Sequence, residues 1–252
     1  MSGFSLTEAD GPSCEHYHAG RKSRWLVVCD HARNKIPLCL GNLGLAQEVM
    51  EQHIAYDVGA EGVARQLADL LQCPALLHGF CRLVVDPNNQ PDTPGIMREI
   101  ACDGTEIPGN RNLSAAHKQA RLDALFRPYH RAIADAMAAI RARGELPLLV
   151  SVHSCTPELN GHQRPWHIGV LWNQDGRLAL PVMKSLEAAG DIRVGDNQPY
   201  SAQETRFYTT SVHAEDLGTP SVLLEIRHDV IATPEQQKAW AGRIFSALPE
   251  SV

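Results

Sequence analysis

The chain has 252 residues, of which 44% are hydrophobic and 21% are charged, and these values are typical of one large globular α/β domain. Its formal net charge is −6 and no cluster of Lys and Arg stands out, so a nucleic acid is not expected as a partner. No apolar run approaches the roughly 18 residues that a membrane span requires, so no membrane association is expected either.

Apolar runs rich in Val, Leu and Ile alternate with helical patterns along the chain. They predict strands at residues 25–29, 75–78, 81–86, 148–152, 168–172 and 222–226. Apolar residues at helical spacing predict helices at residues 58–71, 114–143, 178–189 and 234–247, the second of them interrupted by Pro128. Residues 87–112, rich in Pro, Gly and Asn, are expected to form a long irregular loop. This alternation predicts a three-layer α/β/α fold with a mixed, mostly parallel central sheet.

The cysteines and the N-terminal segment bear on the cellular compartment. Seven cysteines are an odd number and are scattered through core-like segments, which favours reduced thiols over a disulfide framework. The first twenty residues contain no basic region followed by an apolar stretch, as a secretion signal would. We therefore expect a cytoplasmic protein with a single domain over residues 1–252, in which residues 1–23 form a loosely packed N-terminal extension.

Two of the predicted strands lead into a histidine. The runs WLVVCDH and LPLLVSVH end at His31 and His153, and a third run, SVLLEIR, carries Glu225. In a parallel sheet these positions fall at the carboxyl edge, where crevices open and ligands bind. Two imidazoles near a carboxylate suit a hydrolytic zinc site, with Glu225 left to handle protons.

A histidine at the end of a strand is more often a structural or surface residue than a metal ligand. The sequence contains no HExxH motif and no CxxC or Cys/His cluster that would support a zinc site by spacing. The two local contexts, CDHARNKIP and SVHSCTP, nevertheless both pass from an apolar run into a loop of small and polar residues with a proline. This shared pattern favours a site at a strand-to-loop junction.

An ordered series of motifs resembles the N-formylglutamate amidohydrolase (formylglutamate deformylase) family. The series comprises CDHARNKIP, HIAYDVGAEGVARQLA, CRLVVDPNN, DGTEIPGN, RPYHRAI, VSVHSCTP, RPWHIGVLW, VGDNQPYS and VHAEDLGTPSVLLEIRHD. That family is similar to the zinc carboxypeptidases and to the succinylglutamate desuccinylase and aspartoacylase enzymes, with a phosphorylase/hydrolase-like α/β/α fold. The resemblance implies hydrolysis of a small N-acyl amino acid in amino-acid catabolism, such as histidine degradation, with N-formylglutamate giving formate and glutamate.

The resemblance also implies roles for individual residues. His31 and His153 match zinc-ligand histidines, Glu225 matches the glutamate that activates water, and Asp57 matches an aspartate that recurs in the family. The related acylases use His-x-x-Glu for their first two ligands, whereas Asn34 stands three residues after His31 here. For the third ligand of one divalent metal ion, expected to be zinc, Asp57 is the first choice.

Each candidate for the third ligand has an alternative. Asp30 is the second choice, although it adjoins His31 on a strand, where neighbouring side chains point to opposite faces. Asp57 directly precedes the predicted helix at residues 58–71, so it could equally be an N-cap that accepts from free backbone N–H groups.

The string CRLVVDPNN departs from the Asp-x-Asn-Arg string that is common in the family. Asn88 matches the substrate-binding asparagine, but Asn89 stands where the family has the arginine that binds the substrate carboxylate. Another guanidinium is therefore expected to replace it. The candidates are Arg82, Arg164, Arg206 and Arg227. We expect Asn88, Arg82 and Arg227 to contact substrate, with Arg82 favoured, although Arg82 and Asp86 could instead form a structural ion pair.

Two other kinds of protein are compatible with the sequence. A relative that had lost the metal would be a binding protein, and a cysteine-dependent relative would catalyse a different hydrolysis. Ser154 and Cys155 follow His153, but no strand–GxSxG–helix elbow is present, and a cysteine in a core-like run is usually inert. A metal-dependent hydrolase of a small molecule is the preferred interpretation.

Overall fold

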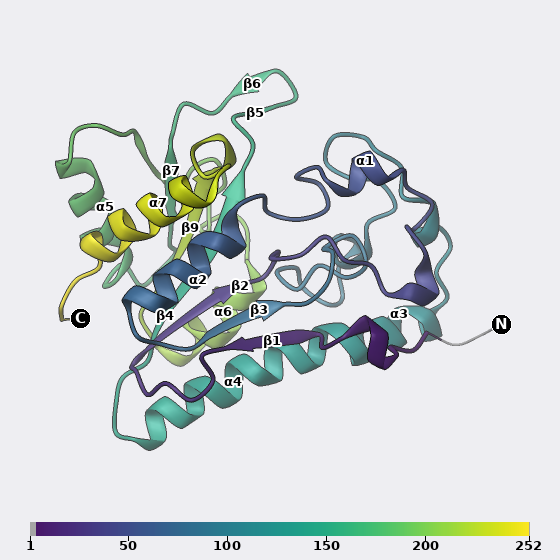
Figure 1. The fold of residues 1–252 in the computed structure, drawn as a ribbon, viewed down its shortest axis with the longest axis horizontal. Helices are drawn as coiled ribbons and strands as arrows, with labels where there is room; N and C mark the ends of the chain where they lie inside the picture. Colours follow the sequence, from purple (N-terminus) through teal and green to yellow (C-terminus); the bar gives the residue numbers. More distant parts are fainter. Residues whose placement is uncertain (1–3, 252) are drawn as a thin grey trace.

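The computed structural model describes residues 4–251, which are built around a seven-stranded sheet (Figure 1). The strand order is β1-β3-β2-β4-β9-β7-β8. The bounds are Cys14–Tyr17 for β1, Ala75–His78 for β3, Trp25–Cys29 for β2, Leu148–Cys155 for β4, Ser221–Arg227 for β9, Ile168–Leu171 for β7 and Val194–Asp196 for β8. Within this seven-stranded sheet of the described residues, only the β1–β3 and β7–β9 pairs are antiparallel, so the sheet is mixed and mostly parallel, as predicted.

Helices cover both faces of this sheet and complete the predicted α/β/α layers. One face packs against α2 (Ala60–Leu70), α5 (Ala179–Ala188) and α7 (Pro234–Ala247), and the opposite face packs against α4 (Arg127–Ala142) and α6 (Tyr208–His213). Because side chains alternate along a strand, Val27 of β2 joins the core under α2 and Val28 joins the core over α4. No helix within residues 4–251 has both the length and the apolar character needed to cross a membrane.

The N-terminal segment is part of the sheet. Its strand β1 pairs with β3 over four residues, with Cys14 opposite His78 and Tyr17 opposite Ala75. Tyr17 also donates to Asp69 at the end of α2. The expectation that residues 1–23 form a loosely packed extension is therefore wrong for residues 14–17, because a four-residue run of mixed polarity gave too weak a strand signal.

The predicted strand at residues 81–86 is also wrong. Cys81 instead begins a turn, in which the Val84 N–H donates to the Cys81 carbonyl at 3.0 Å. The apolar residues of this run, Leu83, Val84 and Val85, are buried in a second core formed largely by loops. A short apolar run indicates that its residues are buried but does not specify their backbone conformation. The pattern therefore could not distinguish this turn from a strand.

One long helical segment covers the predicted range 114–143. It begins with α3 (Ala115–Arg121), continues through a π-helical segment at Leu122–Phe126 and ends with α4. Proline lacks a backbone N–H and cannot make the usual intrahelical bond, and the π segment ends at Phe126, two residues before Pro128. The interruption predicted at this proline is therefore a local change of winding, and the helix continues past it.

The remaining elements form the loop-rich end of the molecule. Residues 87–112 are irregular, as expected, apart from two short 3-10 turns at Pro94–Met97 and Pro108–Asn110 and an isolated antiparallel bridge between Ile100 and Glu106. The short helix α1 (Gln47–Met50) lies in the same loop-rich region, and a hairpin of β5 (Glu158–Leu159) and β6 (His162–Gln163) follows β4. These loops follow the carboxyl ends of the central strands and enclose the region where β2, β4 and β9 end.

Candidate active site

A cavity of about 320 Å³ opens at the carboxyl ends of the central strands. This volume suits a small molecule. The lining includes His31, His153 and Glu225, which strand-end reasoning singled out, and Asp57, which the resemblance implied. Because β4 and β9 are parallel and in register, His153 lies directly opposite Glu225, and both side chains face the same side of the sheet.

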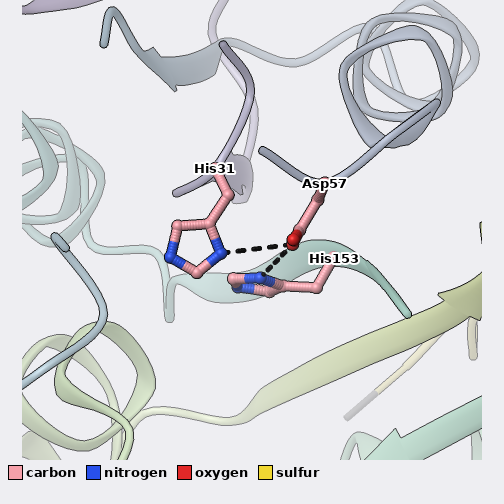
Figure 2. A group of neighbouring side chains, drawn as sticks. All are labelled: His31, Asp57 and His153. Atoms are coloured by element: carbon pink, nitrogen blue, oxygen red, sulfur yellow. Dashed lines mark hydrogen bonds and ion pairs between the residues drawn. The ribbon is translucent and has the colours of Figure 1, made fainter. Parts of the chain in front are cut away.

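His31, Asp57 and His153 form a compact buried group (Figure 2). Their ligand atoms all lie within 4.8 Å of one another, and the two imidazole rings are 4.9 Å apart between centroids. Both Nδ1 atoms point to one oxygen, Oδ2 of Asp57, at 3.2 Å from His31 and 2.8 Å from His153. Two imidazole nitrogens and one carboxylate oxygen form a donor set that could hold a metal ion.

The opposite nitrogen of each ring is held by a further carboxylate. His31 Nε2 lies 2.8 Å from Asp86, and His153 Nε2 lies 3.0 Å from Asp30. An Nε2–H that donates to a carboxylate leaves the Nδ1 lone pair free for a metal, and it fixes the orientation of the ring. Asp30 is itself held, because the Tyr129 hydroxyl donates to it at 2.8 Å.

The charges in this group suit a bound cation. Burial raises the pKa of each aspartate, but the histidines outweigh this effect and hold the pKa of Asp30 at about 2 and that of Asp57 well below its usual value. Burial lowers the pKa of His153, but Asp30 and Asp57 raise it well above the usual value. Three buried aspartates, including Asp86, thus face one arginine, Arg82. Either two protonated histidines or one divalent cation would neutralise the group, so its charge fits a divalent metal.

Among the described residues that line the cavity, Glu225 is the one carboxylate with an oxygen that makes no hydrogen bond. Its side chain is 6% exposed, and Oε2 has no hydrogen-bond partner among the described residues. Burial raises the pKa of Glu225 to about 7, and the nearby charge of Asp57 acts in the same direction. A carboxylate with a pKa near neutrality suits a group that accepts and returns a proton.

The alternatives for the third ligand are separated by geometry. Asp57 is not an N-cap, because α2 begins after Gly59 and receives no side-chain cap bond there. Asp30 lies at Nε2 of His153, the ring nitrogen opposite the one that faces Asp57, where it orients that ring. Asn34 donates to the Met50 carbonyl at 2.9 Å, which is a structural role.

Of the three residues expected to contact substrate, two line the cavity and one does not. Arg82 and Asn88 line the cavity, but Arg82 donates to Asp57 at 3.0 Å and also lies 3.5 Å from Asp86, so the alternative ion pair is present. Asn88 accepts from the Thr209 backbone through its side-chain oxygen. Arg227 does not line the cavity. Its guanidinium is bonded to Asp229, so the structure does not support the expected contact between Arg227 and substrate.

Several cavity residues escaped the sequence reasoning. His53 lines the cavity in an irregular segment, and burial lowers its pKa to about 4, so its ring is neutral. Arg164 is one of the four candidate arginines, whereas Tyr200, which it contacts at 2.9 Å, lies in the motif VGDNQPYS but has no role assigned from the sequence. Both belong to segments without periodicity, where position depends on the tertiary contacts of the loop.

Comparisons with known proteins found a matching family model and similar solved structures. A family model described as N-formylglutamate amidohydrolase matches residues 23–232. A gene product of Agrobacterium tumefaciens has a similar solved structure, with 36% identity, a TM-score of 0.92 and coverage of 95% of this chain and 94% of that one. An N-formylglutamate amidohydrolase from Ralstonia eutropha JMP134 shares the fold, with 18% identity, a TM-score of 0.65 and coverage of 93% and 95%. No curated protein sequence matches the chain.

Proposed function

The chain belongs to the N-formylglutamate amidohydrolase family, and from this premise we propose that it is a metal-dependent amidohydrolase acting on a small N-acyl amino acid. N-formylglutamate is the first candidate substrate, and its hydrolysis would give formate and glutamate. The cavity of about 320 Å³ supports a substrate of this size.

The convergence of both Nδ1 atoms on Asp57 carries the proposal. His31, Asp57 and His153 would hold one divalent ion, zinc being the best match to two imidazoles and a carboxylate, because three protein ligands leave a position open for substrate or water. Asp86 and Asp30 would keep the two rings in the tautomer that presents Nδ1.

Glu225 would carry the proton during the reaction. When bound, the ion would supply Lewis-acid chemistry, polarising the acyl oxygen and acidifying water. Glu225 Oε2, unpartnered and close to neutral pKa, would accept a proton from the attacking water and return it to the leaving nitrogen. His153 and Glu225 come from neighbouring positions on paired strands, so the sheet fixes their relative orientation.

The cysteine-dependent alternative has less support. Cys155 follows the site histidine but is buried, and burial raises the pKa of its thiol well above the usual value. Because the thiolate is the nucleophile, a thiol of this kind is inert near neutral pH.

The test combines metal analysis with a hydrolysis assay. Purified protein should contain about one divalent ion per chain and should release formate from N-formylglutamate in a manner that a chelator abolishes and added zinc restores. His31→Ala and His153→Ala should lose the ion, whereas His16→Ala, at an exposed position on β1, should keep it. Full hydrolysis by metal-free protein, or metal retention in both site variants, would contradict the proposal.

A further inference from the structure

The cavity contains more positive charge than the metal site uses. Four arginines line it: Arg82, Arg98, Arg164 and Arg206. Arg82 is paired with the buried aspartates, and Arg206 is paired with Asp216 at 2.6 Å. Arg98 is exposed, so water can solvate its charge. Arg164 differs from all three.

Arg164 is a buried guanidinium without a counter-ion. The residue is only 8% exposed, and none of the described carboxylates lies within 4.0 Å of it. Burying an unpaired charge is costly, so proteins normally supply a partner. An arginine of this kind at the wall of a ligand cavity indicates that the partner arrives with the ligand.

The surrounding residues hold the Arg164 guanidinium in one orientation. Its Nη1 donates to Thr156 Oγ1 at 3.1 Å, its Nη2 donates to Tyr200 Oη at 2.9 Å, and its guanidinium carbon lies 5.0 Å from the centre of the Tyr200 ring. The Arg164 carbonyl accepts from Arg227 at 3.1 Å, and Arg227 is in turn bonded to Asp229. Arg227, expected to bind substrate, thus supports the residue that lines the cavity.

Tyr200 adds a second donor beside the guanidinium. Its oxygen accepts from Arg164, and its own O–H has no acceptor among the hydrogen bonds of the described residues, so this proton is free for a ligand. Asn89, at the position of the missing family arginine, is occupied with Asp86, to which its Nδ2 donates at 2.8 Å. Residue 89 therefore has no guanidinium to offer a substrate carboxylate, whereas Arg164 has one that is not paired with a described carboxylate.

We propose that Arg164 and Tyr200 together bind a carboxylate of the substrate in the cavity, with Arg164 replacing the arginine absent at Asn89. The inference rests on the proposed function in taking the substrate to be an N-acyl amino acid. A guanidinium and a hydroxyl that donate to one carboxylate form charge-assisted hydrogen bonds, which are stronger than bonds between neutral groups.

The test is a binding comparison between N-formylglutamate and its uncharged diamide, measured by calorimetry on metal-loaded protein that carries Glu225→Gln to slow hydrolysis. This protein should prefer the acid by about ten- to a hundred-fold. Adding Arg164→Gln should remove the preference by weakening the acid alone. Adding Arg206→Gln, a matched change of a cavity arginine already paired with Asp216, should leave the preference intact.

Different outcomes separate this inference from the proposed function. A preference for the acid that disappears with Arg164→Gln supports the inference, whether or not the wild-type protein hydrolyses either compound. Failure of the wild-type protein to hydrolyse N-formylglutamate would count against the proposed function and not against the carboxylate contact. A preference that survives Arg164→Gln, that disappears with Arg206→Gln, or that is absent from the start would overturn the inference. If Arg164→Gln does not fold, Arg164→Lys and Tyr200→Phe replace it, and an unchanged preference in both variants would equally overturn the inference.

Discussion

A substitution at Glu225 can remove proton transfer without removing a metal ligand. The Glu225 side chain is outside the group formed by His31, Asp57 and His153, yet it lies in the same cavity with a free oxygen. Glutamine keeps the shape and hydrogen-bonding reach of glutamate but cannot accept the proton.

Replacing Glu225 with glutamine should lower the turnover number by about two to four orders of magnitude, because a general base contributes roughly this factor. The metal content should stay near that of the wild type, since the ligand set is intact. Steady-state kinetics and elemental analysis of the same preparation test both statements. A variant with wild-type turnover would remove Glu225 from the mechanism.

The same substitution, which should lower turnover, should stabilise the metal-free protein against unfolding at high pH. The pKa of Glu225 rises from 4.5 to about 7 on folding because the carboxyl is buried. Its stabilising contribution is therefore fully present below about pH 4.5 and is lost as pH rises through about 7. At about 1.4 kcal/mol per pKa unit, Glu225→Gln should be more stable than wild type by up to about 3 kcal/mol above pH 7. Denaturant unfolding of the two chelated proteins at pH 4.5 and 8 measures the difference, and a difference independent of pH would be evidence against it.

At the scale of elements, β7 determines how closely the loop carrying Tyr200 can approach the sheet. Gly169 of β7 lies opposite Glu225, and a Cβ there would lie 1.6 Å from the Gln198 carbonyl oxygen. Since that contact involves backbone, a side chain at residue 169 would have to displace the segment that leads to Tyr200.

Gly169→Ala should lower the free energy of unfolding by about 1–3 kcal/mol, as other overpacked substitutions do, and should weaken the preference for a substrate carboxylate. Gly242→Ala in α7 is the matched control, because a Cβ there meets no atom within 4 Å and should stabilise the helix by about 0.5–1 kcal/mol. Thermal unfolding measures the change in stability, and the ratio of the affinities for N-formylglutamate and its diamide measures the change in carboxylate preference. Equal stability of both variants would contradict the proposed contact.

For the whole molecule, the metal is expected to contribute to folding as well as to chemistry. The three buried aspartates near His31 and His153 need either a divalent cation or two added protons, and carboxylates raise the pKa of both histidines. A group with a raised folded pKa stabilises the protein below its unfolded pKa and loses this contribution as pH rises through the folded pKa.

A chelator should therefore destabilise the protein more at pH 8.5 than at pH 6, because protons replace the cation at the lower pH. Metal held at about one hundred times its dissociation constant contributes about 2.7 kcal/mol, so the melting temperature should fall measurably on chelation at the higher pH. Melting curves with and without chelator at the two pH values provide the measurement. A chelator effect that is larger at pH 6 would show that charge compensation by protons does not occur.

Most of the fold follows from local patterns. The strand that leads into His31 and the strands that carry His153 and Glu225 were predictable because continuous apolar runs specify buried strands, and the carboxyl ends of parallel strands meet at one edge. The four predicted helices are likewise present, since amphipathic spacing is a property of the sequence alone. Failures occurred where burial came from loops, as at Leu83 and its neighbours, because a short apolar run does not specify its backbone conformation.

The sequence by itself determined the five inner strands of the sheet, the helices α2, α4, α5 and α7, and the two histidines and glutamate at the sheet edge, because these depend on residues close in the chain. Only the tertiary structure decided that Asp57 faces both imidazoles rather than capping α2, that Arg227 turns away to Asp229, and that Arg164 meets Tyr200 across 36 residues. These contacts join irregular segments whose paths depend on packing against the rest of the molecule. No periodicity encodes such paths, so local propensity could not select among the competing carboxylates and arginines.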